Sequence, residues 1–230
     1  MTTRELIVLG TSSHLPTRYR NHNGYFLRWD AEGILFDPGE GTQRQMTLAG
    51  LSATAITRIC VTHLHGDHCL GLPGIIQRLS ADRVPHAVDL YYPASGQAYI
   101  DRMRRASIFH ETATLRLHPV YWDGEIARGK NFSLVARHLD HRVDSIGYQI
   151  VEDDGRRMIA ARLDHFQIHG PEVGRLQREG HLDKDGIRID LDAVSEPRHG
   201  QRFAFVMDTR LCDRARELAE RADMLVCAGS

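Results

Sequence analysis

The run Thr62-His63-Leu64-His65-Gly66-Asp67-His68 places three imidazoles and one carboxylate within six residues. Neutral imidazole is the commonest metal ligand in proteins, and a carboxylate adds charge balance to such a site. A single histidine or aspartate in this position would more often be structural. Four such side chains at this spacing are typical of a metal centre, because few structural needs call for that density.

The preceding sequence predicts where this run lies in the fold. The segment Arg58-Ile59-Cys60-Val61 is mostly apolar and β-branched, which favours a buried strand. Because side chains alternate along a strand, His63 and His65 are expected on one side. A turn at Gly66 can then aim the last two donors of the run elsewhere. The pattern therefore predicts a loop at a strand end that holds two adjacent metal ions.

Short β-type runs recur along the chain and alternate with helical patterns. Strands are expected at 5–9, 24–29, 33–37, 202–207 and 224–227, with a β-rich stretch at 115–150, and helices at about 43–49, 72–79, 96–105 and 213–222. This order predicts an α/β (α+β) fold in which β-sheets are flanked by helices. A chain of 230 residues suits one sizeable core, so residues 1–230 are expected to form a single domain.

One segment, from about residue 152 to residue 200, differs from the rest. It is polar and charged, and Gly and Pro interrupt it at short intervals. So long a stretch with little periodicity is usually a functional protrusion or a mobile insertion. The alternative is that this segment is an ordinary surface loop without a functional role.

The composition limits the classes of function. The formal net charge is −1 and the pI is near 6.9, so any nucleic-acid binding must depend on a local patch. The longest apolar runs are far shorter than a membrane span, and the first residues lack a secretory signal. The four cysteines have no C-x-x-C spacing, which predicts reduced thiols in a cytoplasmic protein with no membrane partner.

Four donors in one loop cannot complete two metal sites, so further ligands are expected at later strand ends. Asp208 directly follows the apolar run 203–207, and a strand-terminal carboxylate can bridge two metals. His141 follows another strand-like run. Spacing alone leaves His138 and Asp140 as competitors of His141.

Pieces of the whole chain resemble ribonuclease Z, the family of tRNA 3′-processing endonucleases in the metallo-β-lactamase superfamily, and particularly its actinobacterial members. The H-x-H-x-D-H run alone is typical only of the superfamily. Two pieces are typical of ribonuclease Z itself: Gly39–Gln45 resembles its G-E-G-T-Q-R-Q segment, and His141–Tyr148 resembles its H-x-x-x-S-x-G-Y segment. In addition, Pro16–Asn21 resembles its P-x-K/R-x-R-N loop, and Asp208-Thr209-Arg210 resembles the end of its G-D-T-R motif.

The resemblance implies a metallo-β-lactamase αβ/βα sandwich, with two β-sheets flanked by helices and a flexible arm protruding at about 152–200. It also implies two Zn²⁺ ions per subunit, and it selects His141 over its competitors. One zinc would be held by His63, His65, His141 and Asp208; the other would be held by Asp67, His68, the bridging Asp208 and a further histidine. Asp67 would be the catalytic residue that accepts the proton of the attacking water.

The implied substrate is precursor tRNA, from which a zinc-dependent endoribonuclease would remove the 3′ trailer. Arg18, Arg20 and Asn21 form a short basic loop that suits phosphate contact, although a solvated charged loop is the alternative. Arg44 lies at a predicted helix start, where the glycines of the G-E-G segment leave backbone N–H groups for anions. In the family the arm grips the tRNA and serves the partner's active site, which implies a homodimer; the matching arm residues here are Gly170, Pro171 and Arg175.

The chain departs from the family pattern near its end. No histidine follows His199, although the family carries its last zinc ligand and a proton-donor histidine in a later segment. We therefore expect an incomplete second zinc site and a chain cut short at Ser230. Two alternatives to a processing nuclease follow: a truncated tRNA-binding remnant with weak or no catalysis, and a generalist zinc phosphodiesterase that acts on small diesters.

Overall fold

The computed structural model describes residues 4–228, so Ser230 lies outside the described residues. Its larger sheet has the strand order β1-β2-β3-β4-β5-β6. The strands are β1 (Arg4–Gly10), β2 (Gly24–Trp29), β3 (Glu32–Phe36), β4 (Arg58–Cys60), β5 (Val88–Pro93) and β6 (Leu115–Val120). The first three strands are antiparallel neighbours, whereas β3 to β6 run parallel to one another. The carboxyl ends of these four parallel strands therefore lie at one edge of the sheet.

The second sheet has the order β15-β14-β9-β8-β7. Its strands are β7 (Gly124–Arg128), β8 (Phe132–Leu139), β9 (Ser145–Glu152), β14 (Arg202–Val206) and β15 (Met224–Cys227). Both β8 and β14 are antiparallel to β9, which lies between them, so they run in the same direction and end at the same edge. The loops that follow these two strands can therefore meet.

Alternating side chains join the two sheets and their helices into four layers. In β3, Ile34 and Phe36 point into a core shared by both sheets, whereas Leu35 points into a core beneath the helices. Phe36 is fully buried and stacks on Phe205 of β14 with ring centroids 4.6 Å apart. Because both faces of the central strands are buried, their sequences are almost continuously apolar rather than alternating.

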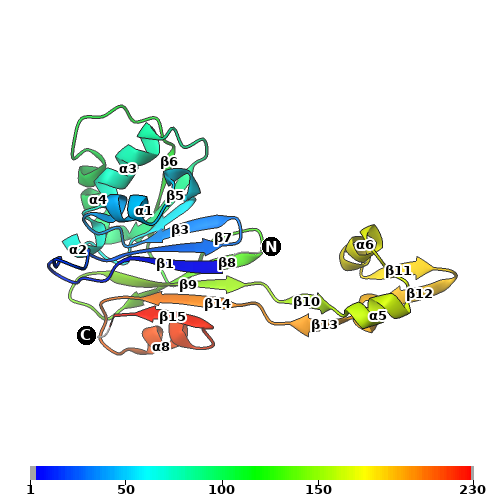
Figure 1. The fold of residues 1–230 in the computed structure, drawn as a ribbon. Coiled ribbons are helices and arrows are strands. Elements are labelled where there is room, and N and C mark those ends of the chain that lie inside the picture. The colour runs from blue at the N-terminus through cyan, green and yellow to red at the C-terminus, as the bar shows by residue number, and fades with distance from the viewer. Residues whose placement is uncertain (1–3, 229–230) are drawn as a thin grey trace.

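Helices cover the outer face of each sheet (Figure 1). The larger sheet is covered by α1 (Thr42–Leu48), α3 (Leu72–Ala81) and α4 (Gln97–Arg104), whose apolar faces include the buried Met46, Ile76 and Ile100. The second sheet is covered by α8 (Asp213–Ala219), which packs Ala215 and Leu218 against Val206. The shorter elements of the body are η1 (Ala53–Ala55), α2 (Gly66–Cys69) and η2 (Ala94–Gly96). The predicted sandwich of two sheets flanked by helices is confirmed.

The segment that follows β9 forms an arm that projects from this body (Figure 1). A two-stranded stem of β10 (Gly155–Met158) and β13 (Ser195–Arg198) carries the distal elements. These are α5 (Ala160–His165), α6 (Pro171–Glu179), β11 (His181–Lys184), β12 (Ile187–Asp190) and α7 (Leu191–Val194). They surround an apolar core of their own, which includes the buried Ile168, Leu176 and Val194. The sequence showed little periodicity here because these helices and strands are too short for their periodicity to stand out.

An ion cluster fixes the base of the arm to the body. Glu152, the last residue of β9, accepts hydrogen bonds from Arg4 of β1 at 2.8 Å and from Arg198 of β13 at 2.7 Å. These charged hydrogen bonds hold the pKa of Glu152 well below its usual range, despite its burial. The carboxylate therefore joins the first strand of the body to the returning strand of the arm.

No helix within residues 4–228 combines the length and the hydropathy that crossing a bilayer requires. The four cysteines are free thiols, as the sequence predicted. Cys69, next to the histidine run, packs in the apolar core, and burial raises the pKa of its thiol to about 12.

Candidate metal centre

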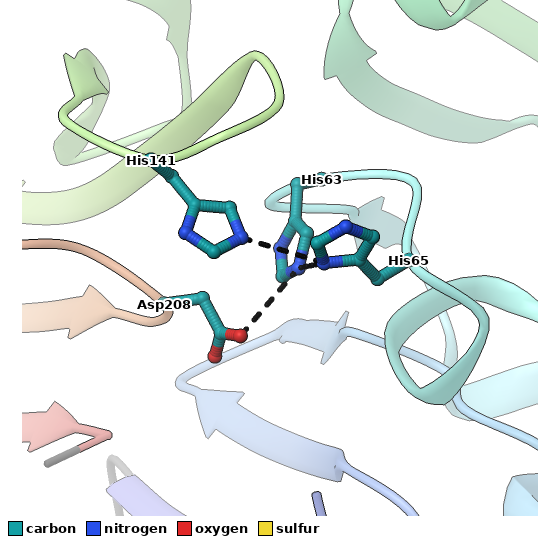
Figure 2. A group of neighbouring side chains, drawn as sticks. All are labelled: His63, His65, His141 and Asp208. Carbon is teal, nitrogen blue, oxygen red and sulfur yellow. Dashed lines mark hydrogen bonds and ion pairs between the residues drawn. The ribbon is translucent and has the colours of Figure 1, made fainter. Parts of the chain in front are cut away.

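Three loops bring the predicted donors together. The histidine run follows β4, the loop with His141 follows β8, and Asp208 lies two residues after β14. Asp208 adopts a left-handed backbone conformation with φ of 35°, which is uncommon for a non-glycine residue. Such strain is often stored where a side chain must be aimed. Here the turn points the carboxylate back at the histidines (Figure 2).

One group of donors has the spacing of a mononuclear site. Each of His63, His65, His141 and Asp208 offers one ligand atom, and these atoms all lie within 4.8 Å of one another. His65 Nδ1 lies 3.0 Å from His63 Nε2 and 3.4 Å from His141 Nε2 (Figure 2). Ligands bound tetrahedrally to Zn²⁺ at its usual bond lengths lie about 3.3 Å from one another. The arrangement therefore fits a four-coordinate metal ion.

A second group of donors lies beside the first and shares Asp208 with it. His68 Nε2 lies 3.4 Å from Asp67 Oδ2 and 3.5 Å from Asp208 Oδ1. The other oxygen of Asp208, Oδ2, lies 3.8 Å from His63 Nε2. Each oxygen of this carboxylate thus faces a different histidine, as a ligand that bridges two metal ions requires.

A buried carboxylate that sequence reasoning did not single out orients both of these histidines. Asp37, directly after β3, accepts hydrogen bonds from Thr62 N and Thr62 Oγ1, each at 2.7 Å. Its Oδ2 also lies 2.8 Å from His68 Nδ1. The Thr62 hydroxyl gives its only hydrogen to Asp37, so it must accept one from His63 Nδ1, 2.9 Å away. The network turns the Nε2 atoms of His63 and His68 toward the centre.

The electrostatics are consistent with a site built for a cation. Burial, together with the neighbouring His68, His65 and His141, lowers the pKa of His63 to about 2, so this imidazole stays neutral and available as a ligand. Burial also disfavours the charged form of His68, but the carboxylates around it, Asp37 first, raise its pKa to about 10. Without a metal ion, a proton on His68 balances the negative charge of the surrounding carboxylates. A bound metal ion would balance that charge in place of the proton. The hydrogen bond to His68 lowers the pKa of Asp67 to about 2 against the effect of burial, which keeps Asp67 anionic.

Gly39 has a different role from the one expected of it. Its N–H donates to Asn23 O at 2.9 Å and is not free for an anion. A Cβ at Gly39 would lie 2.2 Å from Asp67 O, so only glycine permits this close packing on the metal loop. Asn23, held by this contact, places its side-chain Nδ2 3.1 Å from His68 Nε2. The G-E-G segment therefore shapes the centre through packing.

The predicted basic loop contacts the G-E-G segment and α1. Arg18, Arg20 and Asn21 line a groove of about 470 Å³ together with Arg44 of α1 and the highly exposed Tyr19. Asn21 Nδ2 donates to Glu40 O at 2.7 Å, which ties this loop to the G-E-G segment. The three arginines have no carboxylate partner among the described residues. The structure thus brings these four predicted substrate residues together.

The predicted arm residues lie away from the centre, on the distal part of the arm (Figure 1). Gly170, with φ of 55°, precedes α6, and Pro171 is the first residue of that helix. Arg175 projects from α6 and pairs with Glu179 at 3.0 Å. These residues can contact only a ligand that extends well beyond the metal donors, or one bound to another subunit.

Sequence comparison shows the family. The profile described as the metallo-beta-lactamase superfamily matches residues 17–161. Ribonuclease Z of Salinispora arenicola is 60% identical over 98% of this chain and 73% of its own length. The chain belongs to the ribonuclease Z family. Ribonuclease Z of Protochlamydia amoebophila is 45% identical over 99% of this chain and 74% of its own length.

A solved structure supports the same fold. The short form of human tRNase Z superposes with a TM-score of 0.66 over 96% of this chain and 76% of that chain, at 23% sequence identity. At that identity the likeness concerns the fold alone. The alignment extends over nearly the whole chain, so its coverage is not limited to the two sheets.

Proposed function

We propose that this chain is a metal-dependent endoribonuclease that cuts the phosphodiester joining the 3′ trailer to precursor tRNA. The observation that carries the proposal is the division of the two Asp208 oxygens between His63 and His68, in a chain that belongs to the ribonuclease Z family. Hydrolysis of phosphodiesters commonly uses two metal ions a few ångströms apart, and this carboxylate has the placement that such a pair requires.

We infer that the metal is zinc, since three imidazoles with one carboxylate form a donor set that suits Zn²⁺. His63, His65, His141 and Asp208 would hold one ion; Asp67, His68 and Asp208 would supply donors to a second. Bound there, the ions would supply an activated water and neutralise phosphate charge. The donor spacings of 3.0 and 3.4 Å, and the burial that keeps the imidazole of His63 neutral, support this assignment.

Asp67 would act on the attacking water. Its carboxylate is anionic at neutral pH, is only partly buried and follows the turn at Gly66 that separates it from His63 and His65. It can therefore accept a hydrogen bond from the water, and then its proton, while Asp37 and Thr62 keep the histidines oriented. This division of roles separates the group that receives the proton from the groups that only position ligands.

The RNA would be held at two places. Arg18, Arg20 and Arg44, together with Asn21, would contact phosphates next to the cut, because these guanidinium groups share one groove and pair with no carboxylate in residues 4–228. Gly170, Pro171 and Arg175 of the arm would contact the tRNA at a distance. Because a projecting arm can reach across a subunit boundary, we also infer a homodimer, and free thiols favour a reducing, cytoplasmic location.

The test is cleavage of a 5′-labelled precursor tRNA by the zinc-loaded chain, its chelated form and the Asp67→Asn variant. We expect one discrete product ending at the tRNA 3′ end, lost on chelation and strongly reduced in Asp67→Asn. The matched control is Asp82→Asn, an exposed aspartate after α3 that pairs with Arg78. Hydrolysis of a chromogenic small diester without any cut in precursor tRNA would favour the generalist phosphodiesterase. Specific tRNA binding without hydrolysis of either substrate would favour the inactive remnant.

A further inference from the structure

Two adjacent aromatic side chains lie exposed where β6 ends. Tyr121 is 65% exposed and Trp122 is 69% exposed, and their rings stack on each other with centroids 5.8 Å apart at 29°. Adjacent large aromatic side chains that are this exposed are typical of a surface that binds a ligand or partner. Neither residue belongs to the metal donors, the basic groove or the arm.

The sheet topology places this pair at the edge that carries the metal centre. β6 runs parallel to β5, and Val120 pairs with Pro93, so the pair continues beside η2. η2 in turn contacts the histidine run: a Cβ on Gly96 would lie 2.5 Å from Leu64 Cδ2. One short element therefore separates the aromatic pair from the loop of His63 and His65.

Side-chain contacts also connect the pair with the loop that holds His141. Asp123, the residue after Trp122, lies 2.8 Å from His138 Nδ1, and the other ring nitrogen of His138 lies 3.8 Å from Asp144. Asp144 accepts a hydrogen bond from Ser95 Oγ at 2.8 Å. These contacts fix Asp123, the residue that follows the aromatic pair, relative to η2 and to the loop of residues 140–144.

Asp123, the acid directly after the aromatic pair, is already paired with Arg214 at 2.7 Å, so the charge open to a ligand at this edge lies on an arginine of the His141 loop. Arg142, exposed in that loop, lines the cavity of about 320 Å³ that also contains His141 and Asp208. Within residues 4–228 it forms no ion pair, so its guanidinium is available for a phosphate. An aromatic surface combined with a free arginine is the usual arrangement for binding single-stranded nucleic acid.

We propose that Tyr121 and Trp122 form a stacking platform for an unpaired base of the RNA strand that enters the metal centre. This inference rests on the proposed function, since it takes RNA as the substrate. Base stacking on an aromatic side chain tolerates any sequence, because every base has a π-face. The platform would therefore hold a single-stranded end without selecting its sequence, and Arg142 would hold an adjacent phosphate.

Tryptophan fluorescence tests the platform without any need for cleavage. The chain has two tryptophans, of which Trp29 is buried and Trp122 is exposed. A short single-stranded oligoribonucleotide should therefore quench the emission of Trp122, and the Trp122→Phe variant should lose this change. Tyr121→Ala and Trp122→Ala should each weaken binding of the oligonucleotide roughly tenfold. Tyr99→Ala, which removes an exposed tyrosine on α4, is the matched control and should bind as the unsubstituted chain does.

Three results would overturn the platform. The first is single-stranded RNA that binds without quenching Trp122. The second is equal quenching by a fully paired duplex of the same length. The third is a Trp122→Ala variant with unchanged RNA affinity but an altered oligomeric state, which would assign the pair to a protein interface. Quenching that persists in a chain unable to cut precursor tRNA would support the platform while refuting the proposed function, so the two failures are distinguishable.

Discussion

Asp37 Oδ2 lies 2.8 Å from His68 Nδ1, and both side chains are almost completely buried. The same carboxylate holds Thr62 and, through it, His63, so one buried acid orients two histidines of the centre. Carboxylates that hydrogen-bond to metal-binding histidines fix the tautomer and increase ligand basicity. In addition, Asp37 has φ of 43°, a backbone conformation that aspartate and asparagine tolerate better than most residues. The residue is thus suited to its position by both backbone and side chain.

Asp37→Asn should weaken metal binding without unfolding the protein. Asparagine keeps the size and tolerates the same backbone, but it lacks the charge that holds His68 and replaces one acceptor oxygen with a donor. We expect a loss of about 10–100-fold in metal affinity. Competition with a chromophoric chelator measures the affinity, and the thermal unfolding midpoint checks the fold. An unchanged affinity would show that Asp37 has only a structural role.

Asp208→Asn should have a larger effect than Asp37→Asn. An amide retains one weak oxygen ligand but loses the charge and the second oxygen, so neither His63 nor His68 would keep a shared anionic partner. We expect the bound metal to fall toward zero and all hydrolysis to be lost. Metal analysis after gel filtration gives the stoichiometry. A variant that retains two equivalents of zinc would contradict the bridging placement.

The sequence singled out the clustered histidines and acids more readily than the groups that orient them. The spacing of His63, His65, Asp67 and His68 is local, so a single loop reveals it. Asp37 and Thr62 are joined only by the pairing of β3 with β4, and that pairing carries no residue signature. One local signal existed: Asp37, like Asp208, is an acid directly after a run of apolar residues. Applied evenly, that criterion would have identified both carboxylates.

His141 illustrates the limit of spacing as a guide to ligands. Its competitors are as close or closer to the end of β8: His138 is the last but one residue of the strand, and Asp140 directly follows it. In the structure His138 turns to Asp123 at 2.8 Å, and Asp140 pairs with Arg210 at 3.5 Å, which leaves His141 near His65. The choice among these three residues therefore depends on Asp123 and Arg210, which lie in other segments of the chain. The resemblance to the family selected the residue that this packing favours.

Glu152→Gln should destabilise the chain at neutral pH and have little effect in acid. The pKa of this carboxylate in the folded state is far below its ordinary value of 4.5. The stability that it contributes is therefore complete when the pH is above 4.5. This contribution declines as the pH falls below 4.5, and it disappears once the pH is below the folded-state pKa. We expect a loss of roughly 1–3 kcal/mol at pH 7, the usual cost of breaking charged hydrogen bonds.

Urea unfolding of both proteins across the acid range measures this difference. The matched control is Asp154→Asn, an exposed acid at the start of the arm that bonds to the Gly200 N–H at 2.9 Å. It should cost less, because surface groups are well screened. A Glu152→Gln difference that stays constant down to the most acidic pH would show that the loss comes from packing and not from charge.

The two arginines of α6 should differ in their effect on tRNA binding. Arg175 is paired with Glu179, whereas Arg178 is exposed and has no acidic partner among residues 4–228. If the arm contacts phosphates, Arg178→Ala should weaken precursor-tRNA binding more than Arg175→Ala. It should also reduce the slope of log affinity against log salt by about 1, as loss of one phosphate contact requires.

Filter binding at several salt concentrations measures both quantities, and hydrolysis of a small diester is the control. The two substitutions lie on an exposed helix face, so neither should change stability by more than about 0.5 kcal/mol. Small-diester turnover should stay unchanged, because α6 lies far from the metal donors (Figure 1). Equal losses on precursor tRNA and on the small diester would refute the role of the arm, since a distant phosphate contact cannot affect a substrate that does not reach it.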